Sequence, residues 1–127
     1  MKFKPILIVA GEPNSIFFEI FLKVIKNNNF RSPIILIASK KILEKHIRYF
    51  NYNIQFKEID YKKNIKKIYS DRINLINIEY NQKKIFENIS NKSNVYIKKS
   101  FDIALQILNK GVTNKFINGP ISKKTFL

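Results

Sequence analysis

The pattern of apolar residues along the chain predicts two deeply buried strands and one less buried strand in its first 60 residues. Residues 3–10 form a nearly continuous apolar run that ends at Gly11, and residues 33–38 form a second run. Such runs are typical of strands buried on both faces, as in a parallel sheet. Residues 54–59 alternate apolar and polar side chains, which predicts an exposed or edge strand.

Two helices are predicted between these strands. Ser15 is a candidate N-cap for an apolar helix that ends at the three asparagines of residues 27–29. Ser39 is the candidate N-cap of a second helix, which reaches about Tyr49. The apolar residues that indicate the first helix are Ile16, Ile20, Phe21, Leu22, Val24 and Ile25. Those expected on the buried side of the second helix are Ile42, Leu43 and Ile47.

A third helix is predicted to run from Ser93 or Asn94, as cap, to Lys110. Gly111 then closes it as the residue just past its C-terminus, where a left-handed backbone favours glycine. The expected buried side consists of Ile97, Phe101, Ala104, Leu105 and Leu108.

Between residues 60 and 94 the pattern is weaker. Residues 62–69 suit a short helix or a loop, residues 73–78 predict a strand, and residues 81–94 predict an irregular surface excursion. Residues 112–118 predict the last strand, and Ser122 then caps a helix that runs to the end of the chain.

The order of these elements predicts an α/β fold with an open, doubly wound, mostly parallel sheet. A chain of 127 residues, 45% of them hydrophobic, is long and apolar enough to form a core. No internal repeat or linker divides it. Residues 1–127 are therefore expected to form one domain segment, or the first part of a larger protein.

Two glycine turns are the candidate ligand site. Gly11, Glu12 and Pro13 follow the first strand, and Gly119-Pro120 follows the last. In α/β sheets ligands bind at the carboxyl ends of strands, where helix N-termini can offer backbone N–H groups to anions. Glu12 could face a ligand or cap a helix. Lys123, in the first turn of the last predicted helix, could face a bound anion or be a solvated lysine.

The composition excludes several kinds of chemistry. The chain has no Cys and a single His, which rules out disulfides, a cysteine nucleophile and a zinc cluster. His46, in the middle of a predicted helix, is expected to be a surface or partly packed residue and not a ligand. The apolar run at the start is too short for a signal peptide, and no segment has the length of a membrane span, so we expect a cytoplasmic protein.

The net charge of +15 makes a basic, noncatalytic α/β binding domain the alternative function. Arginine, which forks onto phosphate and guanine, occurs only at Arg31, Arg48 and Arg72. The lysines are dispersed over different predicted elements, and their excess accompanies Ile and Asn, which also have A/T-rich codons. We expect weak polyanion binding at low salt and no specific nucleic-acid partner. The aromatic cluster of Phe17, Phe18 and Phe21 is expected in the core and not on a base-stacking surface.

At the two glycine turns the chain resembles the 4-hydroxythreonine-4-phosphate dehydrogenases of pyridoxal phosphate biosynthesis. That family begins with a strand, a Gly-(Asp/Glu)-Pro turn and a Glu-containing helix, which Gly11-Glu12-Pro13 and Glu19 resemble. It later carries Thr-Gly-Pro-Ile-x-Lys, which is similar to Asn118-Gly119-Pro120-Ile121-Ser122-Lys123. The spacing between the two motifs also agrees.

The resemblance implies the first part of the two-domain fold shared with isocitrate and isopropylmalate dehydrogenases, active as a homodimer. The implied reaction is NAD- or NADP-dependent oxidation of a phosphorylated small molecule, 4-phosphooxy-threonine, assisted by zinc, magnesium or cobalt. The β-keto acid then loses carbon dioxide to give 3-amino-2-oxopropyl phosphate, in pyridoxine 5'-phosphate biosynthesis. The chain lacks a Gly-x-Gly-x-x-Gly motif, so the nucleotide is implied by the resemblance alone.

The chain departs from the family in its first loop and in its length. Ser15, Phe17 and Phe18 stand where the family has small residues, including two glycines and a second proline. The family's Gly-His-Thr motif, its metal-binding histidines and its later substrate-binding residues lie beyond the position matching Leu127. We therefore expect no catalytic residue and no metal ligand within residues 1–127, no dehydrogenase activity in this chain alone, and an exposed sheet edge after the last strand.

Overall fold

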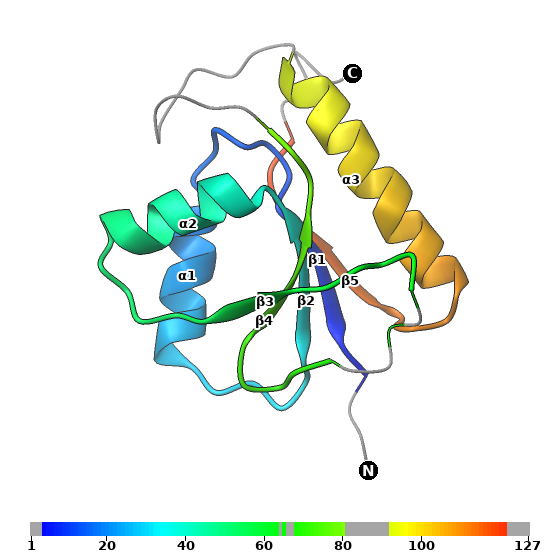
Figure 1. Cartoon of the computed structure of the whole chain (residues 1–127), viewed down its shortest axis with the longest axis horizontal. Helices are drawn as coiled ribbons and strands as arrows, with labels where there is room; N and C mark the ends of the chain where they lie inside the picture. Colours follow the sequence, from blue (N-terminus) through cyan, green and yellow to red (C-terminus); the bar gives the residue numbers. More distant parts are fainter. Residues whose placement is uncertain (1–3, 64, 66–67, 81–91, 122–127) are drawn as a thin grey trace.

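The computed structural model describes residues 4–63, 65, 68–80 and 92–121, which form a five-stranded parallel sheet flanked by helices. The elements are β1 Ile6–Val9, α1 Phe17–Asn27, β2 Ile34–Ala38, α2 Lys40–Tyr49, β3 Phe56–Glu58, β4 Ile73–Asn77, α3 Lys92–Asn109 and β5 Lys115–Asn118. The strand order is β3-β4-β2-β1-β5, and every adjacent pair is parallel. Figure 1 shows α1 and α2 on one side of the sheet and α3 on the other. The predicted doubly wound α/β fold is confirmed.

The sheet is buried at its centre and open at both of its described edges. All five residues of β2 are buried, because neighbouring strands and helices on both faces enclose it. β3 is an edge strand, as its alternating pattern predicts, but it is only three residues long. β5 forms the other edge, and its four residues are all exposed. The exposed edge expected after the last strand is therefore present among the described residues.

The predicted caps are correct for α2 and displaced for α1. The Ser39 hydroxyl accepts a hydrogen bond from the Ile42 N–H at 3.3 Å and is the N-cap of α2. In α1 the N-cap is Ile16, which has no side-chain acceptor. The Ser15 hydroxyl, one residue earlier, still accepts the Phe17 N–H at 3.2 Å. A serine therefore satisfies the start of each helix, but from different positions.

The long helix α3 ends as predicted and begins earlier. Gly111 has φ 76°, and its N–H donates to the Leu108 carbonyl at 3.1 Å, so it is the left-handed closing residue. The helix starts at Lys92, so Ser93 and Asn94 lie within its first turn and are not its N-cap.

The apolar residues that indicate α1 and α3 are only partly on the buried faces of these helices. Ile16, just before α1, Ile20 and Val24 in α1, and Leu105, expected on the buried side of α3, are exposed. The buried apolar residues are Phe18, Phe21 and Leu22 in α1, and Tyr96, Ile97, Ile103, Ala104 and Ile107 in α3. Each helix packs through one stripe, and because both sequences carry apolar residues outside it, periodicity alone does not identify the stripe.

The segment before β4 is a loop where residues 62–69 are described, so the helical alternative is wrong for those residues. Residues 64, 66 and 67, most of the predicted excursion (residues 81–91), and the predicted last helix from Ser122 lie outside the described residues. Residues 92–94, predicted as the end of that excursion, belong to α3. The predicted strand at residues 112–118 is shorter, because pairing with β1 begins at Lys115.

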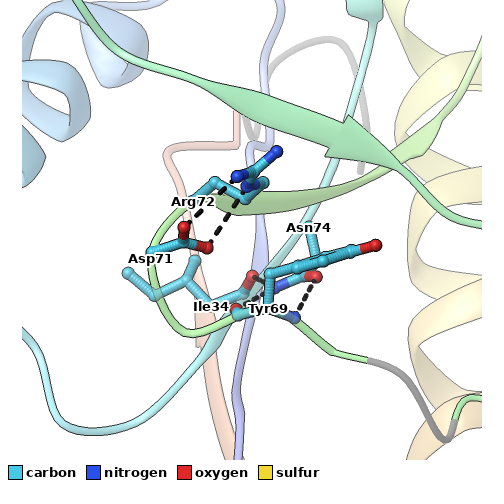
Figure 2. A network of polar contacts seen from close by, with 5 residues as sticks. All are labelled: Ile34, Tyr69, Asp71, Arg72 and Asn74. Carbon is cyan, nitrogen blue, oxygen red and sulfur yellow. Dashed lines mark hydrogen bonds and ion pairs between the residues drawn. The ribbon is translucent and has the colours of Figure 1, made fainter.

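A buried asparagine holds this loop against the sheet. Asn74, in β4, is fully buried, and its Nδ2 donates to the carbonyls of Ile34 at 2.9 Å and Tyr69 at 2.8 Å. Its Oδ1 accepts the Tyr69 N–H at 2.8 Å. Figure 2 shows this bracket beside the Asp71–Arg72 pair. One amide side chain therefore bonds three backbone groups, from the loop and from β2, and fastens the loop to the sheet.

Candidate functional site

The two glycine turns meet at the carboxyl ends of β1 and β5. These strands are adjacent and parallel, with Val9 paired to Asn118, so their turns leave the sheet side by side. The Gly119 N–H donates to the Val9 carbonyl at 2.7 Å, and the Glu12 N–H donates to the Pro120 carbonyl at 2.7 Å. The structure thus brings together five of the six predicted ligand-loop residues, Gly11, Glu12, Pro13, Gly119 and Pro120.

Only glycine fits at the crossing point of the two turns. A Cβ added to Gly119 would lie 2.0 Å from the Ala10 carbonyl oxygen. A Cβ added to Gly11 would lie 2.5 Å from the Pro120 carbonyl oxygen, and the φ of Gly11 is +80°. Both obstacles are main-chain atoms, so a side-chain rotation cannot relieve them.

Backbone amides at this crossing are engaged within the protein. The N–H groups of Glu12 and Gly119 bind carbonyls of the opposite segment, and the Phe17 N–H binds the Ser15 hydroxyl. These three amides are therefore not available to an anion, and the turns brace β1 against β5. The prediction concerns amides at helix N-termini, and the helix predicted after Gly119-Pro120 lies outside the described residues, so anion binding there stays a prediction.

Glu12 and Phe17 both lie beside this crossing. Glu12 is 1% exposed, and its carbonyl accepts both the Ser15 N–H at 3.2 Å and the Ser15 hydroxyl at 2.8 Å. Phe17 lies against Gly119, because an added Cβ there would be 2.9 Å from the Phe17 Cδ1. Its ring also stacks on Phe21, with centroids 5.3 Å apart. Phe17 is half-buried and Phe18 and Phe21 are buried, so the aromatic cluster is part of the core, as predicted.

Lys123 lies outside the described residues, and its role stays a prediction. The ligand role of Glu12 likewise stays a prediction. Its position at the end of β1, buried beside Gly119 and Pro120, is the geometry on which that prediction depends.

The helix α2 begins at the carboxyl end of β2, the same end of the sheet as the glycine turns, and side chains accept hydrogen bonds from the backbone amides of Ser39 and Lys40. The Tyr96 hydroxyl accepts the Ser39 N–H at 2.8 Å, and the Asn77 Oδ1 accepts the Lys40 N–H at 2.9 Å. Burial raises the pKa of the Tyr96 hydroxyl, so the phenol stays protonated. With Ser39 also capping Ile42, this helix start is a structural joint to β4 and α3. The sequence analysis missed this role of Tyr96 and Asn77, since their partners lie 57 and 37 residues away.

His46 is buried between α1 and α2 and is not a surface residue. It is 1% exposed, its Nδ1 lies 2.9 Å from the Ile42 carbonyl oxygen, and its ring stacks on Phe18 with centroids 5.0 Å apart. Burial lowers its pKa, and the Ile42 hydrogen bond and the charge of Glu19 act in the opposite direction. No group of three or more His, Cys, Asp or Glu among the described residues could hold a metal ion.

A cavity of about 450 Å³ lies at the other end of the sheet. Ile34 and Ile73, the first residues of β2 and β4, form part of its floor, and Gln55, just before β3, lines it. It therefore opens at the amino ends of the strands, away from the glycine turns. The sequence analysis did not predict this cavity.

The fold and the paired turns define an open, doubly wound α/β domain with a braced crossing at the carboxyl ends of two adjacent strands. No protein-family model and no curated protein matches the chain. Solved structures do. The chain is similar to a 4-hydroxythreonine-4-phosphate dehydrogenase from Burkholderia phymatum, with a TM-score of 0.82, 15% identity, and coverage of 98% of this chain and 38% of that one.

A 4-hydroxythreonine-4-phosphate dehydrogenase from Klebsiella pneumoniae is similar too. Its TM-score is 0.80 at 15% identity, with 97% of this chain and 39% of that chain covered. The resemblance inferred from the two glycine motifs is therefore confirmed at the level of the fold. The chain spans less than two fifths of the length of these dehydrogenases.

Proposed function

We propose that this chain forms the amino-terminal part of a 4-hydroxythreonine-4-phosphate dehydrogenase. The complete protein would oxidise 4-phosphooxy-threonine with NAD or NADP, and the product would lose carbon dioxide to give 3-amino-2-oxopropyl phosphate. The observation that carries the proposal is the fold match over 98% of the chain, together with two family-like motifs that meet at the carboxyl ends of β1 and β5. A homodimer in the cytoplasm is part of the proposal.

The described residues contain no group of three or more His, Cys, Asp or Glu that could hold a metal ion, and the Glu12 and Gly119 amides are already bonded within the protein. We therefore assign no chemical step to this chain. Its proposed contribution is positional: the crossing of Gly11 and Gly119 fixes the ends of β1 and β5, and Glu12 and Lys123 are proposed to face the substrate. No helix in the described part of the chain is long and apolar enough to cross a membrane.

The test begins with the coding DNA beyond the Leu127 codon. We expect the frame to continue through a Gly-His-Thr motif and spaced histidines. The product of that frame, purified with zinc, magnesium or cobalt, should reduce NAD or NADP when given 4-phosphooxy-threonine. The unphosphorylated amino acid is the matched control and should give little turnover.

Two results would contradict the proposal. One is a complete product that is folded yet inactive with both nucleotides and all three metals. The other is a frame that stops at residue 127 with no separate polypeptide that restores activity when mixed with this chain. Activity of residues 1–127 alone would contradict the narrower expectation that they contribute only positioning.

A further inference from the structure

The cavity at the amino ends of the strands is built from three segments of the chain. Residues 25–34, which run from the end of α1 into β2, form one wall, and the segments entering β3 and β4 form the rest. Its volume of about 450 Å³ lies within the range of about 300–1,000 Å³ typical of small-molecule sites. Because the glycine turns are at the carboxyl ends of the strands, this cavity is independent of the proposed function.

Arg72, which lines the cavity, is held in one orientation. Its Nε and Nη2 donate to the two carboxylate oxygens of Asp71, each at 3.2 Å. Its guanidinium carbon lies 5.1 Å from the centroid of the Tyr69 ring. The backbone N–H and carbonyl of Tyr69 are in turn bonded by the Asn74 amide, as Figure 2 shows. The side chain is one third exposed, at 33%, and Nη1 has no hydrogen-bond partner among the described residues.

A fixed guanidinium with an open donor edge is suited to an oxyanion. Arginine has five N–H donors, and Asp71 occupies two of them, so the outer edge can still bind a carboxylate or phosphate. The cost of ordering the side chain on binding is lower than usual because Asp71 and Tyr69 already restrain it. The Arg72 guanidinium also holds the pKa of Asp71 below its usual range, so both groups are charged at neutral pH.

The rest of the lining sets the charge and polarity of a ligand. Lys26 is a second cation on the wall, positioned 4.7 Å from the centroid of the Tyr52 ring. Lys26 and Arg72 against Asp71 leave a net charge of one positive among the ionisable lining residues. Amides and hydroxyls, which both donate and accept hydrogen bonds, form much of the remaining polar lining: Asn28, Asn29, Asn53, Gln55, Ser32 and Ser70.

We propose that this cavity binds a small hydroxylated anion, a sugar acid or a sugar phosphate, whose single acidic group pairs with the outer edge of Arg72. The hydroxyl groups of the ligand bind the surrounding amides and serines. The isoleucines of the floor, Ile25, Ile34, Ile54 and Ile73, contact its carbon skeleton.

The test is a titration of the isotope-labelled chain, followed by the amide resonances. It uses the Ile117→Lys background, because this residue is on the exposed edge strand β5, does not line the cavity, and its charge opposes association through the open edge. Gluconate and ribose 5-phosphate are the two probes, which distinguish a carboxylate from a phosphate ligand, and ribose is the uncharged control. Saturable shifts are expected at Asn29, Gln55 and Ser70, with Gly11 and Gly119 at the other sheet end unchanged. At least one anionic probe should bind more tightly than ribose.

Matched variants separate recognition by Arg72 from general attraction to a basic protein. Arg72→Gln should weaken binding about tenfold, because a paired charge-assisted contact is lost. Arg72→Lys, which keeps the charge without the fork, should bind with intermediate affinity. Arg48→Gln removes an equal charge from the exposed side of α2, outside the cavity, and should change affinity little.

The proposal is overturned if neither anion gives saturable shifts at the cavity amides up to about 10 mM. It is also overturned if the shifts spread over the lysine-bearing surface and Arg48→Gln weakens binding as much as Arg72→Gln. Thermal melting of each variant checks that its fold is retained. Arg72→Lys provides the folded comparison if Arg72→Gln is unstable.

Discussion

The crossing of the two glycine turns can be tested with three alanine substitutions that separate two kinds of cost. Gly111 and Gly11 have nearly the same backbone conformation, with φ of +76° and +80°. An added Cβ at Gly111 meets nothing within 4 Å, whereas at Gly11 it lies 2.5 Å from a carbonyl oxygen. Gly119 has the close approach, at 2.0 Å, without the left-handed conformation.

The magnitudes follow from these differences. Gly111→Ala should cost about 1 kcal/mol, the usual penalty of a left-handed alanine. Gly119→Ala should cost about 2 kcal/mol, because a main-chain segment must shift to accommodate the new carbon. Gly11→Ala carries both costs and should lose about 3 kcal/mol. The double variant of Gly11 and Gly119 should lose less than the sum, since one displacement of the turns relieves both clashes.

Urea unfolding followed by circular dichroism measures these values. A difference of about 2 kcal/mol between Gly11→Ala and Gly111→Ala corresponds to a midpoint shift of about 1 M urea. Equal slopes among the variants would show that only the stability has changed. If Gly11→Ala and Gly111→Ala agree within about 0.5 kcal/mol, the two turns do not cross closely and the braced crossing is refuted.

Four further predictions concern the bracket, the buried histidine, the open edge and the charge. Asn74→Ala should lower the free energy of unfolding by about 3 kcal/mol, one for each lost hydrogen bond, as measured by urea unfolding. Asn74→Asp should cost at least as much, because its second oxygen would face two carbonyl oxygens. Equal stability of Asn74→Asp and the exposed control Asn114→Asp would contradict this. Burial lowers the pKa of His46 in the folded protein, so the unfolded chain binds a proton more readily. The contribution of His46 to stability should be complete above the ordinary pKa of 6.5 and should be lost as the pH falls below it. The urea midpoint of His46→Phe should therefore decline less between about pH 7 and about pH 5 than that of the wild type, and an equal decline would contradict the lowered pKa. The exposed edge strand β5 should make the chain aggregate, and Ile117→Lys, at a residue 55% exposed, should reduce the light scattering of the sample. A monodisperse wild-type monomer with a sharp thermal melt would contradict this prediction. Binding to two unrelated oligonucleotides of equal length should be weak, equal and lost with modest salt; submicromolar, sequence-selective binding at about physiological ionic strength would instead favour the basic binding domain.

The sequence by itself determined the fold class and the place of the candidate site. The continuous apolar runs at β1 and β2 and the alternation at β3 distinguish these central strands from an edge strand, because burial on two faces favours apolar side chains at every position of a strand. Gly11 and Gly119 were also identifiable, since a glycine directly after a strand indicates a turn with special backbone requirements. The serine cap of α2 and the glycine closing α3 depend on neighbours within a few residues, so they too are local signals.

Only the tertiary structure decided which side chains and backbone amides of these segments contact one another. Gly11 and Gly119 are more than 100 residues apart in sequence, and their contact follows from the pairing of β1 with β5. The same contact engages the Glu12 and Gly119 amides with carbonyls of the opposite segment. The burial of His46 and Asn74 and the cavity beside Arg72 arise likewise from packing between distant segments. Local patterns specify the conformation of a segment, whereas contacts between segments depend on strand order and helix orientation, which no short stretch of sequence encodes.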